Sequence, residues 1–246
     1  PERFAKALDA GADAVIIDLE DAVQEDAKHA ARDHIRGFSP DPAATRFLVR
    51  SNAADTPWFE EDMALCREHP GVDGVVLPKA ESVEQIARVR ELTGKPIIPI
   101  VESAKGVLAM DELAKAKGVR RLAFGYLDLM LDTGTRPDTP GARVLMDHIR
   151  SRMLLSSAAA GILPPLDGVH PDFRDSETLS SIAIHVRDMG FAGLLCIHPA
   201  QVAVVHAAFA PSEEEQGWAT RVIQEYERTG AAAFQVDGKM VDAPVI

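Results

Sequence analysis

The chain alternates short apolar runs with longer amphipathic stretches along most of its length. Seven runs have the length and the β-branched content of strands: 12–20, 46–52, 71–79, 95–103, 120–128, 164–170 and 191–199. Helical periodicity occupies the segments 25–38, 58–69, 82–94, 104–118, 142–161 and 175–190. Continuously apolar strands that alternate with helices indicate a parallel sheet covered by helices, which is an α/β fold.

The strand and helix units follow one another without a linker halfway along the chain, and this favours a closed barrel over an open sheet. A chain of 246 residues with 46% hydrophobic content can bury the core of one such domain. We therefore expect a TIM (β/α)8 barrel over residues 1–210. The segment 1–11 is predicted to be a helix that leads into the first visible strand, so we expect the first barrel strand to precede Pro1.

Residues 211–246 extend beyond the expected barrel. Pro211 and Ser212 begin a further helix that has acidic residues in its first turn. Asp237 and Gly238 form a predicted turn between two short apolar runs. We expect this segment to be a C-terminal helix and lid extension rather than an independent domain.

Composition excludes several classes of protein. A net charge of -12 argues against a nucleic-acid or membrane surface as partner. Cys66 and Cys196 are far apart and belong to no CxxC or Cys/His cluster, so neither a disulfide framework nor a structural zinc site is indicated. With no signal peptide and no apolar run long enough to span a bilayer, we expect a cytoplasmic location.

Three charged residues each follow an apolar run in the predicted sheet: Arg50, Glu102 and Asp128. The carboxyl ends of parallel strands meet on one face of a barrel, so these side chains should converge on one site. Mg²⁺ prefers oxygen ligands and commonly keeps water molecules beside one or two protein carboxylates. The planar guanidinium of Arg50 suits a carboxylate held by two parallel hydrogen bonds. The sequence thus predicts a hard cation beside an anionic substrate.

Eight motifs resemble, in order, those of the citrate lyase β-subunit-like proteins in the HpcH/HpaI aldolase superfamily, which includes malyl-CoA and citramalyl-CoA lyases. They are VIIDLEDAV, LVRSN, VVLPKAES, PIVESAKGV, FGYLDL, LDGVHPDF, CIHPAQ and DGKMVDAP. The resemblance implies a Mg²⁺-dependent lyase, with Mn²⁺ as a substitute ion. Such an enzyme cleaves a 3-hydroxyacyl-CoA thioester of the citramalyl-CoA, malyl-CoA or citryl-CoA type to an oxo acid and acetyl-CoA, by a retro-Claisen or aldol mechanism.

The resemblance also implies roles for the residues of the first site. Glu102 and Asp128 would be the metal ligands, and Arg50 would bind the oxo-acid end of the substrate. Glu20 and Asp21 would orient Arg50 or metal-bound water; the alternative is that they cap the helix that follows them.

Four further positions carry weaker implications of the resemblance. Asp242 would reach the active site of an adjacent subunit as general acid or base, which requires a homo-oligomer such as a homotrimer or a dimer of trimers; a solvated tail acid is the alternative. His198 would contact the substrate or fix a turn, and Lys6 would contact coenzyme A. Leu194 stands where the family usually has Lys, which raises an acyl carrier protein or another thioester as the bearer of the acyl group.

Two rival functions stay open at this point. One is a noncatalytic or acyl-carrier-dependent β subunit of a citrate-lyase-like complex. The other is a pyruvate aldolase of the same superfamily, which would carry a His where this chain has Asp21. The identity of the oxo acid is not fixed by Arg50, since pyruvate, glyoxylate and oxaloacetate all present a carboxylate to it.

Overall fold

The computed structural model describes residues 2–38 and 47–246, without the side chain of Glu2. Pro1 and Arg46, the first residues of the predicted helix 1–11 and strand 46–52, lie outside the described residues. Contacts between residues divide the chain into two units, Pro1–Ala208 and Phe209–Ile246. Each unit is described by itself.

The first unit is built on a parallel sheet of seven strands in chain order. The strands are β1 (Val15–Asp18), β2 (Phe47–Arg50), β3 (Val72–Leu77), β4 (Ile97–Val101), β5 (Ala123–Phe124), β6 (Leu166–Asp167) and β7 (Gly193–Leu194). Each pairs in parallel with the next. Every predicted strand is therefore present and the parallel α/β arrangement is confirmed, although β5, β6 and β7 are much shorter than the apolar runs that contain them.

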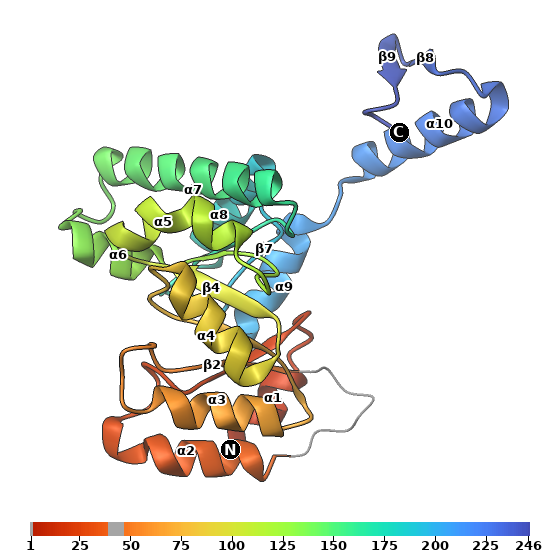
Figure 1. Ribbon diagram of the computed structural model, residues 1–246. Coiled ribbons are helices and arrows are strands. Elements are labelled where there is room, and N and C mark those ends of the chain that lie inside the picture. Colours follow the sequence, from red (N-terminus) through yellow and green to blue (C-terminus); the bar gives the residue numbers. More distant parts are fainter. Residues whose placement is uncertain (1, 39–46) are drawn as a thin grey trace. The chain divides into compact units, whose positions relative to one another are not determined.

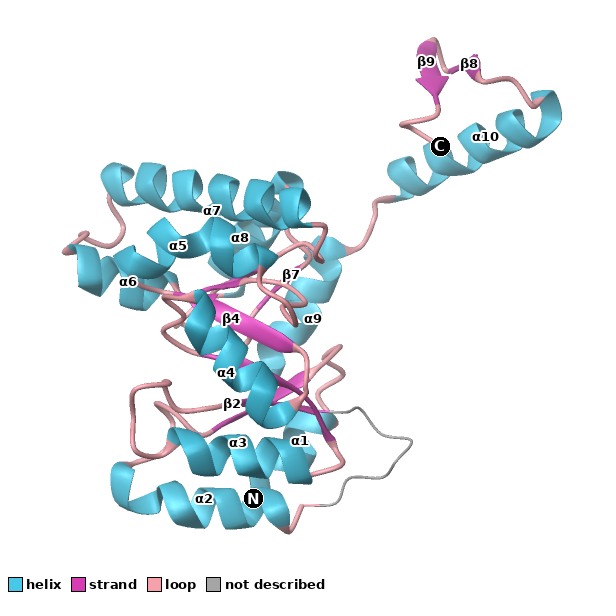
Figure 2. Ribbon diagram, in the orientation of Figure 1, coloured by secondary structure: helices cyan, strands magenta, loops and turns pink. Residues whose placement is uncertain are grey.

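Helices lie around these strands (Figure 1 and Figure 2). The helical elements of the chain are α1 (Glu2–Leu8), η1 (Glu25–Ala27), α2 (Lys28–Arg36), α3 (Phe59–Glu68), α4 (Val83–Thr93), α5 (Ala104–Lys115), α6 (Tyr126–Thr133), α7 (Pro140–Ala160), α8 (Ser176–Met189), α9 (Pro199–Phe209) and α10 (Glu213–Thr229). Several begin and end where the sequence directs. In α4, Ser82 and Gln85 form a capping box, and in α7 the Thr139 hydroxyl accepts a hydrogen bond from Ala142 N while Pro140 occupies the first turn.

The structure shows part of the expected barrel but not its closure. A barrel closes when its last strand bonds to its first. Among the described residues β1 pairs only with β2 and β7 only with β6, so both remain edges of a curled sheet. The structure thus shows a parallel half-barrel, and the predicted eight-stranded ring is not present in the part of the chain that it describes.

The segment 120–128 corrects one prediction. It was expected to be a strand that reaches Asp128, but the strand ends at Phe124 and Tyr126 begins α6. The apolar side chains of Leu127 and Leu129 extend the strand-like run in the sequence, whereas in the structure they belong to the first turn of a helix. Asp128 therefore enters the site from a helix rather than from a strand end.

Apolar side chains of the strands pack together in a buried cluster. Val76, Ile98, Ile100 and Ala123 form a buried cluster that is flanked by partly buried Leu195 and by other strand residues. Ile100 and Leu195 also line the pocket described below. The floor of that pocket is consequently continuous with the hydrophobic core.

The second unit contains α10 and an antiparallel hairpin of β8 (Ala233–Val236) and β9 (Lys239–Asp242). Asp237 and Gly238 join the two strands with φ angles of 50° and 77°, so the predicted turn is confirmed. Val222 of α10 packs against Val236 and Val241 of the hairpin. No helix among the residues that the structure describes is long and apolar enough to cross a membrane.

Candidate active site

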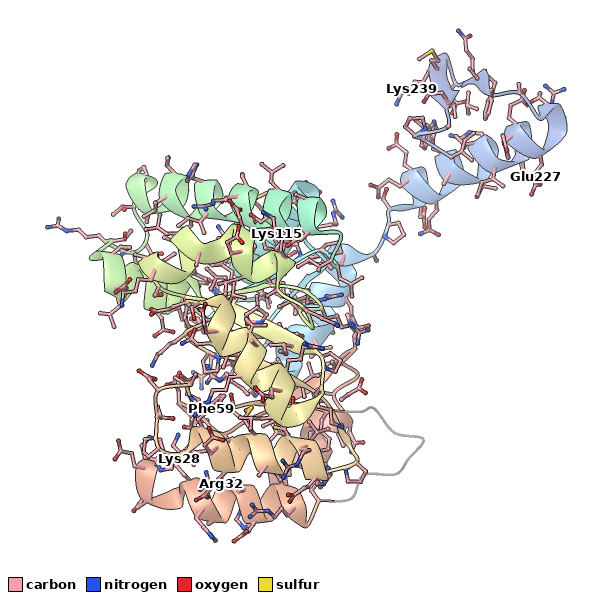
Figure 3. All side chains as sticks on the ribbon, viewed as in Figure 1. Lys28, Arg32, Phe59, Lys115, Glu227 and Lys239 are labelled. Atoms are coloured by element: carbon pink, nitrogen blue, oxygen red, sulfur yellow. The ribbon has the colours of Figure 1, made fainter. Side chains whose placement is uncertain are left out.

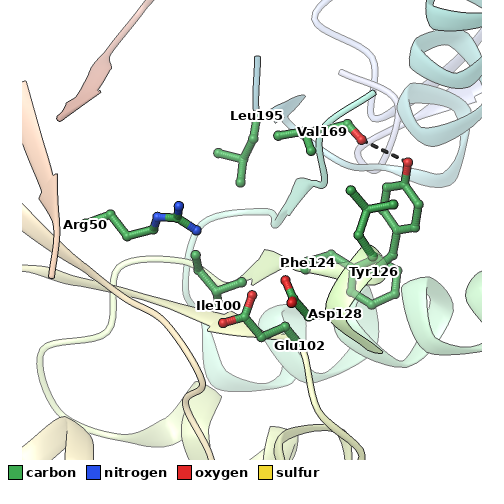
Figure 4. A pocket seen from close by; sticks show the side chains of 10 residues that line it. Arg50, Ile100, Glu102, Phe124, Tyr126, Asp128, Val169 and Leu195 are labelled. Atoms are coloured by element: carbon green, nitrogen blue, oxygen red, sulfur yellow. Dashed lines mark hydrogen bonds between the residues drawn. The ribbon is translucent and has the colours of Figure 1, made fainter. Parts of the chain in front are cut away.

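One pocket of the first unit collects the three charged residues that the sequence placed together. It is lined by Arg50, Ile100, Glu102, Phe124, Gly125, Tyr126, Leu127, Asp128, Val169 and Leu195. Figure 4 shows the carboxylates of Glu102 and Asp128 close to one another, with the guanidinium of Arg50 entering from another wall. The empty space among these residues is about 360 Å³ when the open mouth is included.

Glu102 is held in one orientation from two sides. It follows β4 and is 5% exposed. Its Oε1 accepts a hydrogen bond of 2.7 Å from the backbone N–H of Lys79, a residue with the left-handed φ of 47°. Its Oε2 lies over Gly125, where an added Cβ would come within 2.5 Å. Because only glycine leaves room for this oxygen, Gly125 and Lys79 together set the direction of the carboxylate.

Electrostatics make this pocket receptive to a cation. Burial raises the pKa of Glu102 to about 7; the neighbouring carboxylates of Glu20 and Asp128 add to the rise, and the hydrogen bond from Lys79 opposes it. Asp128 is exposed in the first turn of α6. A divalent cation between Glu102 and Asp128 would relieve the repulsion between two crowded carboxylates.

The donor set fits Mg²⁺ or Mn²⁺ better than Zn²⁺ or Cu²⁺. Across residues 2–38 and 47–246 no group of three or more His, Cys, Asp and Glu side chains is arranged to hold a metal ion. Two carboxylates without imidazole or thiolate match an ion that keeps several water molecules. The residues present therefore fit the Mg²⁺ that the sequence predicts, and Glu102 and Asp128 would be its protein ligands.

Arg50 is engaged by a residue that the sequence analysis missed. Its Nε and Nη2 donate hydrogen bonds of 2.7 and 2.6 Å to the two oxygens of Asp18. One edge of the guanidinium is thus occupied by an internal carboxylate, which leaves the remaining Nη hydrogens for other partners. Asp18 and Arg50 are partners in the β1–β2 register, so their shared position at the ends of consecutive strands was the available signal.

Charge balance around Arg50 depends on this pair. Burial opposes the charged form of Arg50, but Asp18, Glu20 and Asp21 outweigh it and raise the pKa of the guanidinium above its usual range. Burial likewise acts to raise the pKa of Asp18, yet the hydrogen bonds and charge of Arg50 bring it below the ordinary value. Both side chains therefore stay ionised at neutral pH.

Glu20 and Asp21 both approach Arg50, as expected from the sequence. The Oε2 atom of Glu20 lies 3.1 Å from Nη1 of Arg50, and Oδ2 of Asp21 lies 3.4 Å from the same nitrogen. Glu20 is buried and its Oε1 is 3.7 Å from Nζ of Lys79, whereas Asp21 is exposed. Burial raises the pKa of Glu20 to about 7, while Arg50 opposes the rise.

A buried lysine holds the backbone that carries Glu20. Lys28 and Arg32 both lie on α2 (Figure 3). Nζ of Lys28 lies 5.4 Å from the ring centre of Trp58, the residue before α3, and Arg32 pairs with Asp62 of α3. Nζ of Lys28 donates hydrogen bonds of 2.7 Å to the carbonyl oxygens of Leu19 and of Glu20. The segment after β1 is therefore fixed by two charged groups, Lys28 at its carbonyls and Asp18 at its N–H groups.

Five of the predicted site residues lie outside the pocket lining, and two of them, Glu20 and Asp21, still contact Arg50. The other three are His198, Lys6 and Asp242. His198 is exposed; its ring stacks on Phe173 at 4.4 Å and its Nδ1 accepts a hydrogen bond from Ala200 N, an arrangement that fixes the start of α9. Lys6 is exposed in the last turn of α1. Asp242 ends β9 in the other unit, where it is half-buried. Their roles toward a substrate stay predictions.

The comparisons with known proteins agree with the motifs. Residues 1–199 match the HpcH/HpaI aldolase/citrate lyase family. A citrate lyase subunit beta-like protein of Mycobacterium tuberculosis is 40% identical over 249 residues, which cover 100% of this chain and 88% of that protein. A (3S)-malyl-CoA thioesterase of Cereibacter sphaeroides is 36% identical over 245 residues, with 96% of this chain and 84% of the relative covered.

Solved structures give the same result. The crystal structure of CitE from Mycobacterium tuberculosis in complex with magnesium, acetoacetate and coenzyme A superposes with a TM-score of 0.84 and 39% identity, covering 100% of this chain and 90% of the other. RipC from Yersinia pestis superposes with a TM-score of 0.74 and 31% identity, covering 84% and 93%. By the extent of these matches, the chain belongs to the HpcH/HpaI aldolase/citrate lyase family.

Proposed function

We propose that this chain is a Mg²⁺-dependent carbon-carbon lyase that cleaves a 3-hydroxyacyl-CoA thioester to an oxo acid and acetyl-CoA. The observation that carries the proposal is the pocket in which Glu102, Asp128 and Arg50 converge. The relative crystallised with magnesium, acetoacetate and coenzyme A supports the same classes of ligand. Citramalyl-CoA, malyl-CoA and citryl-CoA are the candidate substrates.

Each charged residue has a task in this reaction. Glu102 and Asp128 would hold Mg²⁺, which when bound supplies Lewis-acid stabilisation of negative charge on the substrate oxygens. The free Nη hydrogens of Arg50 would bind the carboxylate of the oxo-acid fragment, with the guanidinium kept in place by Asp18. Glu20 and Asp21 would help to orient the guanidinium by their negative charge, 3.1 and 3.4 Å from Nη1.

Cleavage requires two proton movements. Transfer of the hydroxyl proton to water turns the alcohol into the carbonyl of the oxo acid as the adjacent carbon-carbon bond breaks, and the bonding pair passes to the acetyl thioester carbon. That carbon then takes up a proton to give acetyl-CoA. We propose that Asp242 of a neighbouring subunit delivers this proton, which requires a homo-oligomer. We propose a cytoplasmic homotrimer or dimer of trimers as that assembly.

A hydrolytic outcome is the second candidate. Relatives named (3S)-malyl-CoA thioesterase match 96% of this chain at 36% identity. Hydrolysis of the thioester would release free coenzyme A and the intact hydroxy acid, whereas the lyase releases acetyl-CoA and an oxo acid. The two activities are thus separated by their products alone.

The test is an assay of the purified protein with malyl-CoA, citramalyl-CoA and citryl-CoA, in Mg²⁺ and in EDTA, with chromatographic separation of acetyl-CoA from free coenzyme A. Mg²⁺-dependent acetyl-CoA formation from one thioester supports the lyase, and Glu102→Gln serves as the inactive control.

Free coenzyme A with an intact hydroxy acid would favour the thioesterase. No turnover of any thioester, followed by turnover with the acyl group on a carrier protein, would favour the carrier-dependent subunit and direct attention to Leu194 and Lys6. Cleavage only of free hydroxy oxo acids would favour the pyruvate aldolase.

A further inference from the structure

A buried ion pair lies behind the segment that carries Asp128. Arg150 of α7 donates from Nε to Oδ1 of Asp167 at 2.9 Å and from Nη2 to Oδ2 at 3.0 Å. The side chain of Asp167 is 1% exposed and that of Arg150 is 11% exposed. Nη1 of Arg150 also donates to Asp147 one turn earlier on the same helix, at 2.9 Å. The guanidinium is therefore fixed in plane by two carboxylates.

The same guanidinium contacts two aromatic rings of the pocket wall. Its central carbon lies 5.6 Å from the ring centre of Phe124 and 6.0 Å from that of Tyr126. These two residues flank Gly125, over which the carboxylate of Glu102 lies, and Tyr126 precedes Asp128 by two positions in the first turn of α6. An arginine plane against these rings restricts where the turn from β5 into α6 can lie.

Two further contacts tie this turn to the segment after β6. The hydroxyl of Tyr126 donates a hydrogen bond of 2.9 Å to the carbonyl of Val169. Gly168 is in such close contact with the turn that an added Cβ would lie 2.7 Å from the carbonyl oxygen of Phe124. The position of Asp128 thus depends on β6 and α7 as well as on its own helix.

We propose that Arg150, clamped by Asp167, is a positioning residue for the Mg²⁺ site, acting through Phe124 and Tyr126 on the turn that presents Asp128. The inference rests on the proposed function in which Glu102 and Asp128 hold the ion. Misplacement of a carboxylate ligand by its supporting groups typically weakens metal affinity 10- to 100-fold. Replacing Arg150 should therefore weaken the metal site although Arg150 does not touch the metal.

A different result is expected if the Arg150–Asp167 pair only stabilises the fold. A buried ion pair can often be replaced by apolar side chains of similar size without loss of stability, whereas removal of one partner leaves an unpaired buried charge. The double variant Arg150→Met/Asp167→Leu removes both charges together. If the pair only holds the fold, this variant should bind the metal as the unaltered protein does once it has folded.

The experiment measures metal affinity rather than turnover. Mn²⁺ takes oxygen ligands as Mg²⁺ does, and its free fraction is read from the electron paramagnetic resonance signal during titration of the full chain. The variants are Arg150→Lys, which keeps a cation but loses the planar fork, and the double variant. Arg152→Met is the matched control, because Arg152 lies on the same helix and pairs with Asp111 at 3.4 Å, away from the pocket.

The expected result is a Mn²⁺ dissociation constant raised about 10- to 100-fold in Arg150→Lys and in the double variant, with Arg152→Met unchanged. Thermal unfolding identifies which variants are folded. If the double variant is unfolded, the Mn²⁺ affinity of Arg150→Lys alone tests the inference. Unchanged Mn²⁺ affinity in a folded Arg150 variant would overturn the inference and leave the proposed function standing. Absence of Mn²⁺ and Mg²⁺ binding in the unaltered protein would overturn both.

Discussion

Asp18→Asn tests the support of Arg50 most directly. The Asp18 carboxylate accepts four hydrogen bonds, from Nε and Nη2 of Arg50 and from the backbone N–H groups of Glu20 and Ala22. Asparagine offers one acceptor oxygen, and its NH₂ group would face a donor on the other side. The substitution therefore removes about two of the four bonds, at least one of them to a charged partner.

The expected cost follows from burial. The side chains of Asp18 and Arg50 are 19% and 22% exposed, so solvent screens the pair only in part. Hydrogen bonds to charged groups contribute about 1.5–3 kcal/mol and neutral ones about 1 kcal/mol, which gives a loss of about 2–4 kcal/mol in the free energy of unfolding. Asp33→Asn is the matched control: its pair with Arg36 has the similar distance of 2.8 Å but side chains 52% and 43% exposed, so it should cost about 0–1 kcal/mol.

The assay is urea unfolding followed by circular dichroism at pH 7 and at lower pH. The pKa of Asp18 is lowered in the folded protein, so its contribution is present above the unfolded value and is lost as pH falls through the folded value. The difference between Asp18→Asn and the unaltered protein should therefore shrink in acid. A loss at pH 7 no larger than that of Asp33→Asn would refute the reasoning, as would a large loss that stays constant down to pH 2.

The remaining predictions concern the metal, the pocket floor and the tail. Glu102→Gln or Asp128→Asn should abolish Mg²⁺-dependent cleavage while circular dichroism shows an intact fold; full activity in either would contradict the metal assignment. Mn²⁺ affinity should weaken as pH falls below about 7, because the pKa of Glu102 is about 7 and a protonated carboxyl is a poor ligand; equal affinity at pH 5.5 and 8 would argue against this ligand. Gly125→Ala should displace Glu102, since its Cβ would lie 2.4 Å from that of Glu102, and should lose both stability and Mn²⁺ binding. Gly141→Ala, in α7 with no atom near its added Cβ, should instead leave both intact or gain about 1 kcal/mol in stability. Asp242→Asn should lower kcat and leave KM nearly unchanged; equal loss in both would mean that the tail only holds subunits together.

Much of the fold was predictable because the signal is local. Buried parallel strands are continuous apolar runs, and each of the seven expected runs contains a strand. The convergence of Arg50 and Glu102 followed from one rule of parallel sheets, that strand ends share a face. These statements need only the order of the elements and not their exact packing. Asp128 joins Arg50 and Glu102 because α6 begins two residues after the end of β5.

The contacts that were missed depend on tertiary geometry. Asp18 reaches Arg50 only because the β1–β2 register places them opposite one another. Asp167 meets Arg150 across a separation of 17 residues and an intervening chain reversal. Tyr126 was assigned to a strand because a short apolar run has no period that distinguishes strand from helix. Closure of the barrel likewise depends on which edges meet, and hydrophobic periodicity carries no information about that.

Glu20 and Glu102 both have pKa values of about 7, so each carboxyl can gain or lose a proton when a ligand binds near neutral pH. A cation between Glu102 and Asp128 favours ionised Glu102 and expels a proton, while an anion beside Arg50 favours protonated Glu20 and takes one up. The two ligands thus exchange protons with the solvent in opposite directions, so that binding of both exchanges fewer protons in total than binding of either one alone. Calorimetric titrations in two buffers of different ionisation enthalpy would count those protons, with opposite signs for metal and oxo acid.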